Sequence, residues 1–61
     1  MPETTIIRGI LLDLINSPDD GGFYWEEFNR ETREFRYSKE VYPTRRAAKA
    51  AILNGTVVWE A

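Results

Sequence analysis

Apolar side chains near the start of the chain recur at intervals of three and four residues. In the segment 4-TTIIRGILLDLINSPDD-20 they are Ile6, Ile7, Ile10, Leu11, Leu14 and Ile15. This spacing is typical of one face of an amphipathic helix, and the proline at position 18 favours an end to the helix just before it. The pattern therefore predicts a helix over residues 5–16. The β-branched isoleucines at its start and Gly9 count against a helix.

Residues 23–42 alternate between aromatic and charged side chains, which is the pattern of a β-hairpin. At its centre the tetrad NRET occupies positions 29–32 and is followed by Arg33. This combination predicts a type I turn closed by a residue in the left-handed conformation, a position that glycine prefers. The turn would place Phe28 opposite Phe35, which sets the register of the two strands.

In that register both faces of the hairpin carry large aromatic side chains. A sheet with helices on one side needs only one apolar face. We therefore expect either that both faces are covered or that one of them presents an aromatic surface to a partner. Glu27 and Arg36 lie in position for a cross-strand ion pair. One face is predicted to hold Tyr24, Glu26, Phe28, Phe35, Tyr37 and Val41, and the other Phe23, Trp25, Glu27, Glu34, Arg36 and Tyr42.

An alanine-rich segment follows the hairpin and predicts a second helix over residues 45–55. Thr44 is suited to cap its start, and Asn54-Gly55 is a good C-terminal stop. The last residues, 56–61, predict a short strand. We therefore expect an α+β fold in a single small domain, residues 1–61, with an antiparallel three-stranded sheet and two helices in the order α-β-β-α-β.

The amino-acid composition excludes the catalytic groups that most enzymes use. The 61 residues include no cysteine and no histidine, so the chain has no thiol nucleophile and no imidazole base. A chain of this size also has little room for a ligand pocket of ~300 Å³ or more. We expect a protein that is not an enzyme and that has no cofactor and no metal site.

The charge and hydropathy of the chain argue against nucleic acid and membrane as partners. Ten acidic and eight basic residues give a net charge of -2, which argues against a general nucleic-acid binder. The longest apolar run, residues 10–12, is too short to span a membrane, and the first five residues lack the basic start of a signal peptide. We expect a soluble cytoplasmic protein without a membrane partner.

Three cations at the start of the second helix form the first candidate site. Arg45, Arg46 and Lys49 lie where the partial positive charge of a helix end disfavours cations. In one interpretation they pair with acids on the surface, such as Glu40 or Asp13. In the other they bind an acidic partner surface or a phosphate.

Tyr24 and Trp25 form the second candidate site. In one interpretation they belong to the core. In the other they lie exposed at an interface, where Trp, Tyr and Arg concentrate binding energy. The sequence thus predicts a small regulatory protein, an inhibitor or adaptor of bacterial or phage type. It would dock on the acidic surface of a larger protein. The alternatives are nucleic-acid binding through the sheet and a homodimer of structural role. The predicted partner-binding residues are Arg45, Arg46, Lys49, Trp25 and Tyr24.

Residues 22–53 combine a YW pair, the turn NRETRE, a second strand and the segment YPTRRAAKAAI. In this layout they resemble the arm-type DNA-binding domains of phage integrases and the plant ethylene-response-factor domains. In those families an antiparallel sheet lies in the major groove and its exposed arginines and lysines read the DNA. The resemblance implies such roles for Arg30, Arg33, Arg36 and Lys39. The same residues also resemble the small YegP-like bacterial proteins, which implies a hairpin followed by an alanine-rich helix.

Overall fold

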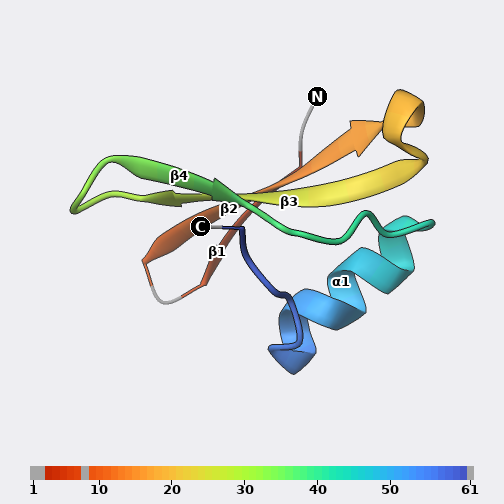
Figure 1. Cartoon of the computed structure of the whole chain (residues 1–61). Helices are drawn as coiled ribbons and strands as arrows, with labels where there is room; N and C mark the ends of the chain where they lie inside the picture. Colours follow the sequence, from red (N-terminus) through yellow and green to blue (C-terminus); the bar gives the residue numbers. More distant parts are fainter. Residues whose placement is uncertain (1–2, 8, 61) are drawn as a thin grey trace.

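Four antiparallel strands form a single sheet in the computed structural model, which describes residues 3–7 and 9–60 (Figure 1). The strands lie side by side in chain order: β1 (Glu3–Ile7), β2 (Ile10–Ser17), β3 (Gly22–Asn29) and β4 (Glu34–Tyr37). A short 3-10 helix, η1 (Pro18–Asp20), connects β2 to β3, and one α-helix, α1 (Arg45–Asn54), follows the sheet.

The predicted helix over residues 5–16 is wrong, because this segment forms β1, a tight turn and β2. Ile7 pairs with Ile10, so only two residues separate the strands, and Gly9 in this turn has a φ of 79°, which glycine adopts without strain. Within β2 the buried residues are Leu12 and Leu14, and their spacing of two is the period of a strand. The β-branched isoleucines that weaken a helix fit a strand well.

The end of the chain also differs from the prediction. Residues 56–60 form no strand element, and their β-pairing is limited to one isolated bridge between Ser38 and Trp59. Two backbone hydrogen bonds of 2.8 Å flank this bridge, from the N–H of Lys39 to the carbonyl of Val58 and from the N–H of Glu60 to the carbonyl of Tyr37. Position 61 lies outside the described residues. The predicted order α-β-β-α-β is therefore corrected to β-β-β-β-α, with four strands and one helix.

The predicted hairpin turn and register are confirmed. Phe28 pairs with Phe35 and Glu27 with Arg36. Arg33 has a φ of 60°, and its N–H donates to the carbonyl of Asn29 at 2.7 Å. The side-chain oxygen of Asn29 accepts further hydrogen bonds from the backbone N–H groups at positions 31 and 32. A polar tetrad therefore closes the turn with an arginine in the left-handed conformation.

Helix α1 forms where the alanine-rich segment predicted it. The hydroxyl of Thr44 accepts a hydrogen bond from the N–H of Ala47 at 3.1 Å, and Gly55 ends the helix in the left-handed conformation. Both are the capping interactions that satisfy backbone groups at helix ends.

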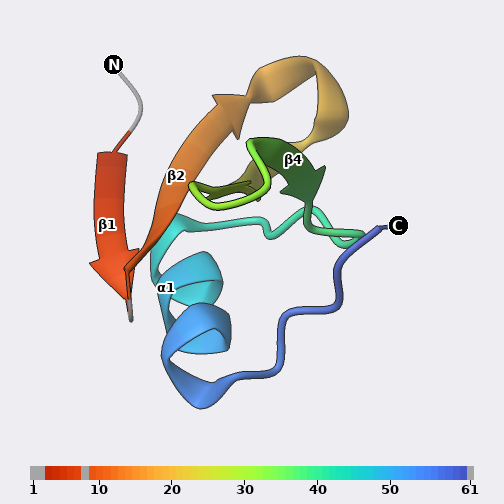
Figure 2. The ribbon, with the colours of Figure 1, turned by 90° about the vertical axis from the view of Figure 1, so that its left-hand side faces the viewer.

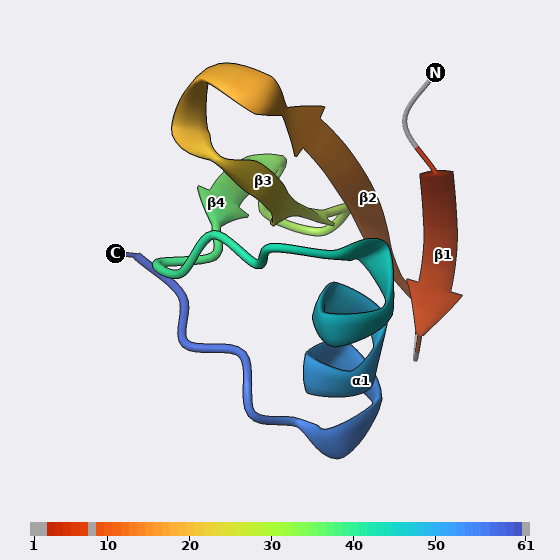
Figure 3. The same ribbon diagram turned by 90° about the vertical axis from the view of Figure 1, so that its right-hand side faces the viewer.

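The core lies between one face of the sheet and α1, and the two side views show the helix on that side of the sheet (Figures 2 and 3). Its centre is Trp25, which is 1% exposed, and whose indole N–H donates to the carbonyl of Ala48 at 2.8 Å. Small side chains on α1 let the helix approach the sheet closely enough for this bond. The buried apolar residues are Leu12, Leu14, Trp25, Tyr42, Ala48 and Ala51.

We expect Trp25→Phe to lower the free energy of unfolding by roughly 2 kcal/mol, because it shrinks a core side chain and removes the donor to the Ala48 carbonyl. Urea unfolding followed by circular dichroism measures the loss. Trp59→Phe is the matched control, since Trp59 is only partly buried, and we expect a smaller loss there. Equal losses in the two variants would contradict the central role of Trp25.

Arg33→Gly should leave the free energy of unfolding unchanged or raise it by up to about 1 kcal/mol. Glycine adopts a positive φ without the steric cost that arginine incurs, and this gain is offset in part by its larger entropy loss on folding. Arg30→Gly, in the same turn but without a positive φ, is the control and should be destabilising. A clear loss of stability in Arg33→Gly, measured by thermal unfolding, would refute this account of the turn.

Candidate functional site

The sheet has one covered face and one open face. Helix α1 and the C-terminal segment lie together on one side of the sheet (Figures 1 and 2), and neither crosses to the other side. The covered face receives Trp25 and Glu27, which are both buried. The side chains that alternate with them along the strands form the open face.

Side chains on the open face form rows that cross the strands. The apolar row takes one residue from each strand, successive members being pairing partners: Ile6, Leu11, Phe28 and Phe35. The carboxylate row lies beside it and contains Thr4, Asp13, Glu26 and Tyr37. Ile15 and Tyr24 form a third, shorter row on β2 and β3.

The apolar row is incompletely shielded from solvent. Ile6 is 61% exposed and Phe35 is 56% exposed, while Leu11 and Phe28 are half-buried between their neighbours. The rings of Phe28 and Phe35 contact each other with centroids 4.7 Å apart, and those of Tyr24 and Tyr37 lie 6.1 Å apart in an edge-to-face arrangement. These residues form rows of aromatic and aliphatic side chains on the side away from α1.

Two carboxylates interrupt this surface. Asp13 and Glu26 lie directly opposite each other on β2 and β3, and the hydroxyl of Thr4 donates to the Asp13 carboxylate at 2.5 Å. Among the described strand residues the one cation, Arg36, pairs with Glu27 on the covered face. Like charges in opposed positions destabilise a sheet, so the open face carries a negative charge that no strand residue offsets.

The predicted cationic site lies on α1, and two of its three cations are already paired. Lys49 Nζ lies 2.5 Å from the carboxylate of Glu3, and Arg45 Nε lies 3.6 Å from it. Glu3 on β1 thus takes the place of the acids predicted to pair with these cations, Glu40 and Asp13. The hydrogen bond from Lys49 lowers the pKa of Glu3 below its ordinary value of 4.5.

The predicted aromatic residues separate between the two sides of the sheet. Trp25 is a core residue and is not available to a partner. Its rings are buried against α1, and its indole N–H donates to the carbonyl of Ala48. Tyr24 is half-buried on the open face. The five predicted binding residues therefore do not form one surface, since Arg45, Arg46 and Lys49 belong to the helix on the covered side.

The cations implied by the integrase resemblance do not gather on the open face either. Arg36 makes two hydrogen bonds to Glu27, and its guanidinium lies 5.1 Å from the centroid of the Trp59 ring. Arg30 and Arg33 lie in the β3–β4 turn, and Lys39 follows β4. These four side chains are distributed over three parts of the fold.

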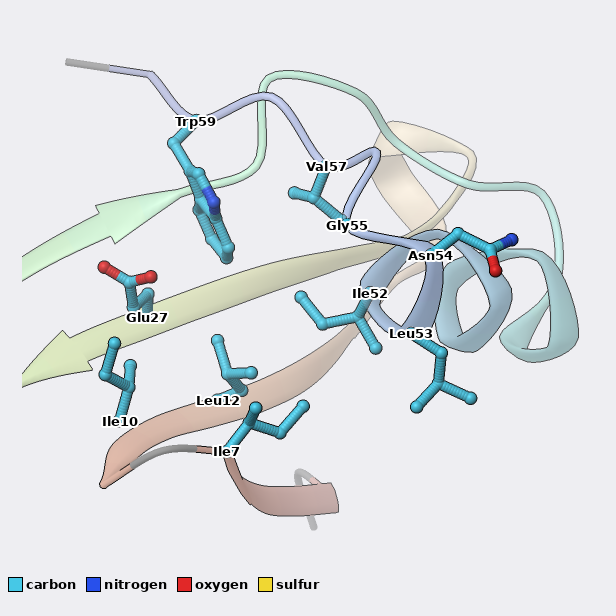
Figure 4. Close-up of a pocket in the computed structure, with 10 residues that line it drawn as sticks. All are labelled: Ile7, Ile10, Leu12, Glu27, Ile52, Leu53, Asn54, Gly55, Val57 and Trp59. Atoms are coloured by element: carbon cyan, nitrogen blue, oxygen red, sulfur yellow. The ribbon is translucent and has the colours of Figure 1, made fainter.

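A groove of about 520 Å³ lies on the covered side, between the sheet and the end of α1 (Figure 4), so the expectation that a chain of this size has little room for a pocket of ~300 Å³ is wrong. Of the described residues that line it, Glu27 alone is ionisable, and Arg36 donates hydrogen bonds to both oxygens of that carboxylate. The groove therefore offers no pair of groups for acid–base catalysis. It is lined by Ile7, Ile10, Leu12, Glu27, Ile52, Leu53, Asn54, Gly55, Val57 and Trp59.

Within residues 3–7 and 9–60 there is no cluster of three or more side chains suited to hold a metal ion. The helices in the same ranges are too short or too polar to cross a membrane.

Half of the open face escaped prediction because its residues were assigned to a helix. Ile6, Leu11, Asp13 and Ile15 come from β1 and β2. The signals that could have placed them are the β-branched isoleucines and Gly9, which count against a helix, since Leu11 and Ile15 are as apolar as Leu12 and Leu14 and conceal the period of two. The β3 and β4 half of the face follows from the hairpin register.

Replacing Glu3 by glutamine should lower the melting temperature at neutral pH, because it removes the anion that holds Lys49 and Arg45. A lowered pKa in the folded state means that the stabilisation is present above the unfolded pKa, about 4.5, and is lost as the pH falls through the folded value. The difference in melting temperature between the wild type and Glu3→Gln should therefore shrink below pH ~4.5. A difference that stays constant from neutral to acid pH would contradict the ion pair.

Comparison with protein-family models, with curated proteins and with solved structures finds no match to this chain. The resemblances to the integrase, ethylene-response-factor and YegP-like domains therefore stay predictions. Function is therefore inferred from the geometry of the covered face and the open face.

Proposed function

We propose that this chain is a non-catalytic protein-binding module that acts in the cytoplasm and docks on a larger protein through the open face of its sheet. The observation that carries the proposal is the apolar row, in which Ile6 and Phe35 are each more than half exposed. Two further aromatic residues of the same face, Tyr24 and Tyr37, lie beside it.

Burial of this face would release a substantial free energy. Apolar surface removed from water stabilises a complex by roughly 25 cal/mol per Å² before the costs of association. Aromatic residues are also the side chains that concentrate binding energy at interfaces. Contiguous apolar patches on monomeric proteins often mark such interaction sites, and here the patch spans all four strands.

Nucleic-acid binding through the sheet, the first alternative, is less well supported. Affinity for nucleic acid comes mainly from cations that contact phosphates, and the strand residues of the open face include Asp13 and Glu26 but no lysine or arginine. The carboxylates would repel a phosphate backbone.

A homodimer that buries the open face against itself, the second alternative, meets the same charges. A two-fold axis brings the same patch of both copies together, so the carboxylates of one copy would approach those of the other. Removing unpaired charges from water is costly. We therefore favour a partner of different sequence over a second copy.

The cationic side of α1 is a second candidate surface, as the sequence predicts for an acidic partner. Arg46 makes no ion pair with the described residues, and it lies beside the exposed Leu53 in a shallow hollow. This surface has less apolar area to bury than the open face, and Glu3 already neutralises part of its charge.

A selection of random peptides displayed on phage against the immobilised wild-type protein tests the proposal. We expect the enriched peptides to bind the double variant Ile6→Ser, Phe35→Ser at least about tenfold more weakly, because it removes the exposed ends of the apolar row. Both positions are largely exposed, so the variant should keep its fold, which circular dichroism checks.

Leu53→Ser is the matched control, because Leu53 is 78% exposed and lies on α1, across the sheet from the open face. Its affinity for the same peptides should be unchanged. If no peptide is enriched, or if the open-face variant binds as well as the control, the proposed function is wrong. Acidic peptides that are lost on Arg46→Glu would assign binding to α1 instead.

A further inference from the structure

We infer that the partner presents a lysine or arginine flanked by apolar side chains, and that Asp13 and Glu26 together recognise this cation. The inference rests on the proposed function and adds the chemistry of the partner to it. Two observations carry it: the carboxylate row lies between two apolar rows, and the strand residues that the structure describes place no lysine or arginine on this face.

On the open face, each carboxylate lies between two apolar side chains of its own strand. Asp13 lies two residues from Leu11 and two from Ile15 on β2, and Glu26 is placed in the same way between Tyr24 and Phe28 on β3. Alternate residues on one face of a strand lie roughly 7 Å apart. A partner side chain that meets the carboxylates therefore has apolar surface on either side of it, within the reach of neighbouring side chains.

Covering this face has an electrostatic cost. Asp13 and Glu26 are half-buried already, and any partner that contacts the apolar row removes more water from them. Desolvating carboxylates without a counter-charge is strongly unfavourable, whereas a cation with good geometry offsets that cost. A neutral or acidic partner surface is thus selected against, and a cationic one is selected for.

The fold gains nothing from this charge pair. Opposed carboxylates weaken the pairing of β2 with β3, while the other two acids that face the helix side, Glu27 and Glu3, each have a cationic partner. The hydroxyl of Thr4 holds Asp13 in place by a hydrogen bond but supplies no charge. Among the described strand residues, the open face therefore has no cation to pair with Asp13 and Glu26, and a partner would supply one.

The double variant Asp13→Asn, Glu26→Gln tests the inference with the peptides enriched on the wild type. We expect those peptides to be rich in Lys and Arg next to apolar residues, and to bind the neutral variant about tenfold more weakly or worse. Raising the salt concentration should weaken binding to the wild type more than to the variant. The thermal stability of the variant alone should be equal to the wild type or higher.

The matched control is Asp19→Asn, Glu31→Gln, which makes the same change in net charge at exposed positions in η1 and in the β3–β4 turn. Its affinity should equal that of the wild type. If the control loses as much affinity as the open-face variant, the effect comes from net charge alone and the inference is wrong.

Two results would separate this inference from the proposed function. Peptides without cations, which need Ile6 and Phe35 but bind the neutral variant unchanged, would overturn the inference and leave the proposed function standing. Peptides that bind independently of Ile6 and Phe35 would overturn both. Analytical ultracentrifugation of the wild type alone tests the homodimer. A dimer that Phe35→Ser abolishes would show that a second copy, and not a cationic partner, covers the open face.

Discussion

The fold depends on the hydrogen bond between the Trp25 indole and the carbonyl of Ala48, because this contact joins the sheet to the helix. Trp25 is also tied to the chain that leads from β4 to α1, since its backbone N–H donates to the hydroxyl of Ser38 and its carbonyl accepts from the Ser38 N–H. One residue thus connects β3, that segment and the helix, through its backbone to Ser38 and through its side chain to Ala48. In a chain of 61 residues, which buries only ~60% of its unfolded surface, such a contact has few substitutes.

A single helix explains why the sheet has two different faces. Ten residues of helix cover one side of a four-stranded sheet, and residues 3–7 and 9–60 form no second α-helix for the other side. The charges follow the same division: on the covered side Glu27 pairs with Arg36, and Glu3 with Lys49. On the open side Asp13 and Glu26 face each other without a strand cation.

The sequence could be interpreted correctly where local signals are strong. The tetrad at 29–32 and Arg33 defined the hairpin, and Thr44 with Gly55 defined the helix. The first two strands were missed because both faces of the sheet carry apolar residues there. When Leu11 and Ile15 face one side and Leu12 and Leu14 the other, the alternation of apolar and polar positions disappears, and a helical spacing emerges by coincidence.

The assignment of exposure was a harder problem than the register. The hairpin register predicts Trp25 and Tyr24 on opposite faces, and the structure confirms it. Which of those faces would be buried depended on where α1 packs, and no local signal in residues 23–42 gives that. The sequence could therefore predict an exposed aromatic face for the hairpin of β3 and β4. The half of that face on β1 and β2 became visible only in the three-dimensional structure.

The separation of the two faces has a consequence for how such a protein can evolve. The residues of the apolar row contribute little to the core. Substitutions there can therefore match changes in the surface of a partner while the protein stays folded at every step. The core positions around Trp25 have no such freedom. Across related chains, the covered face should therefore diverge slowly, while the open face should covary with the surface that it meets.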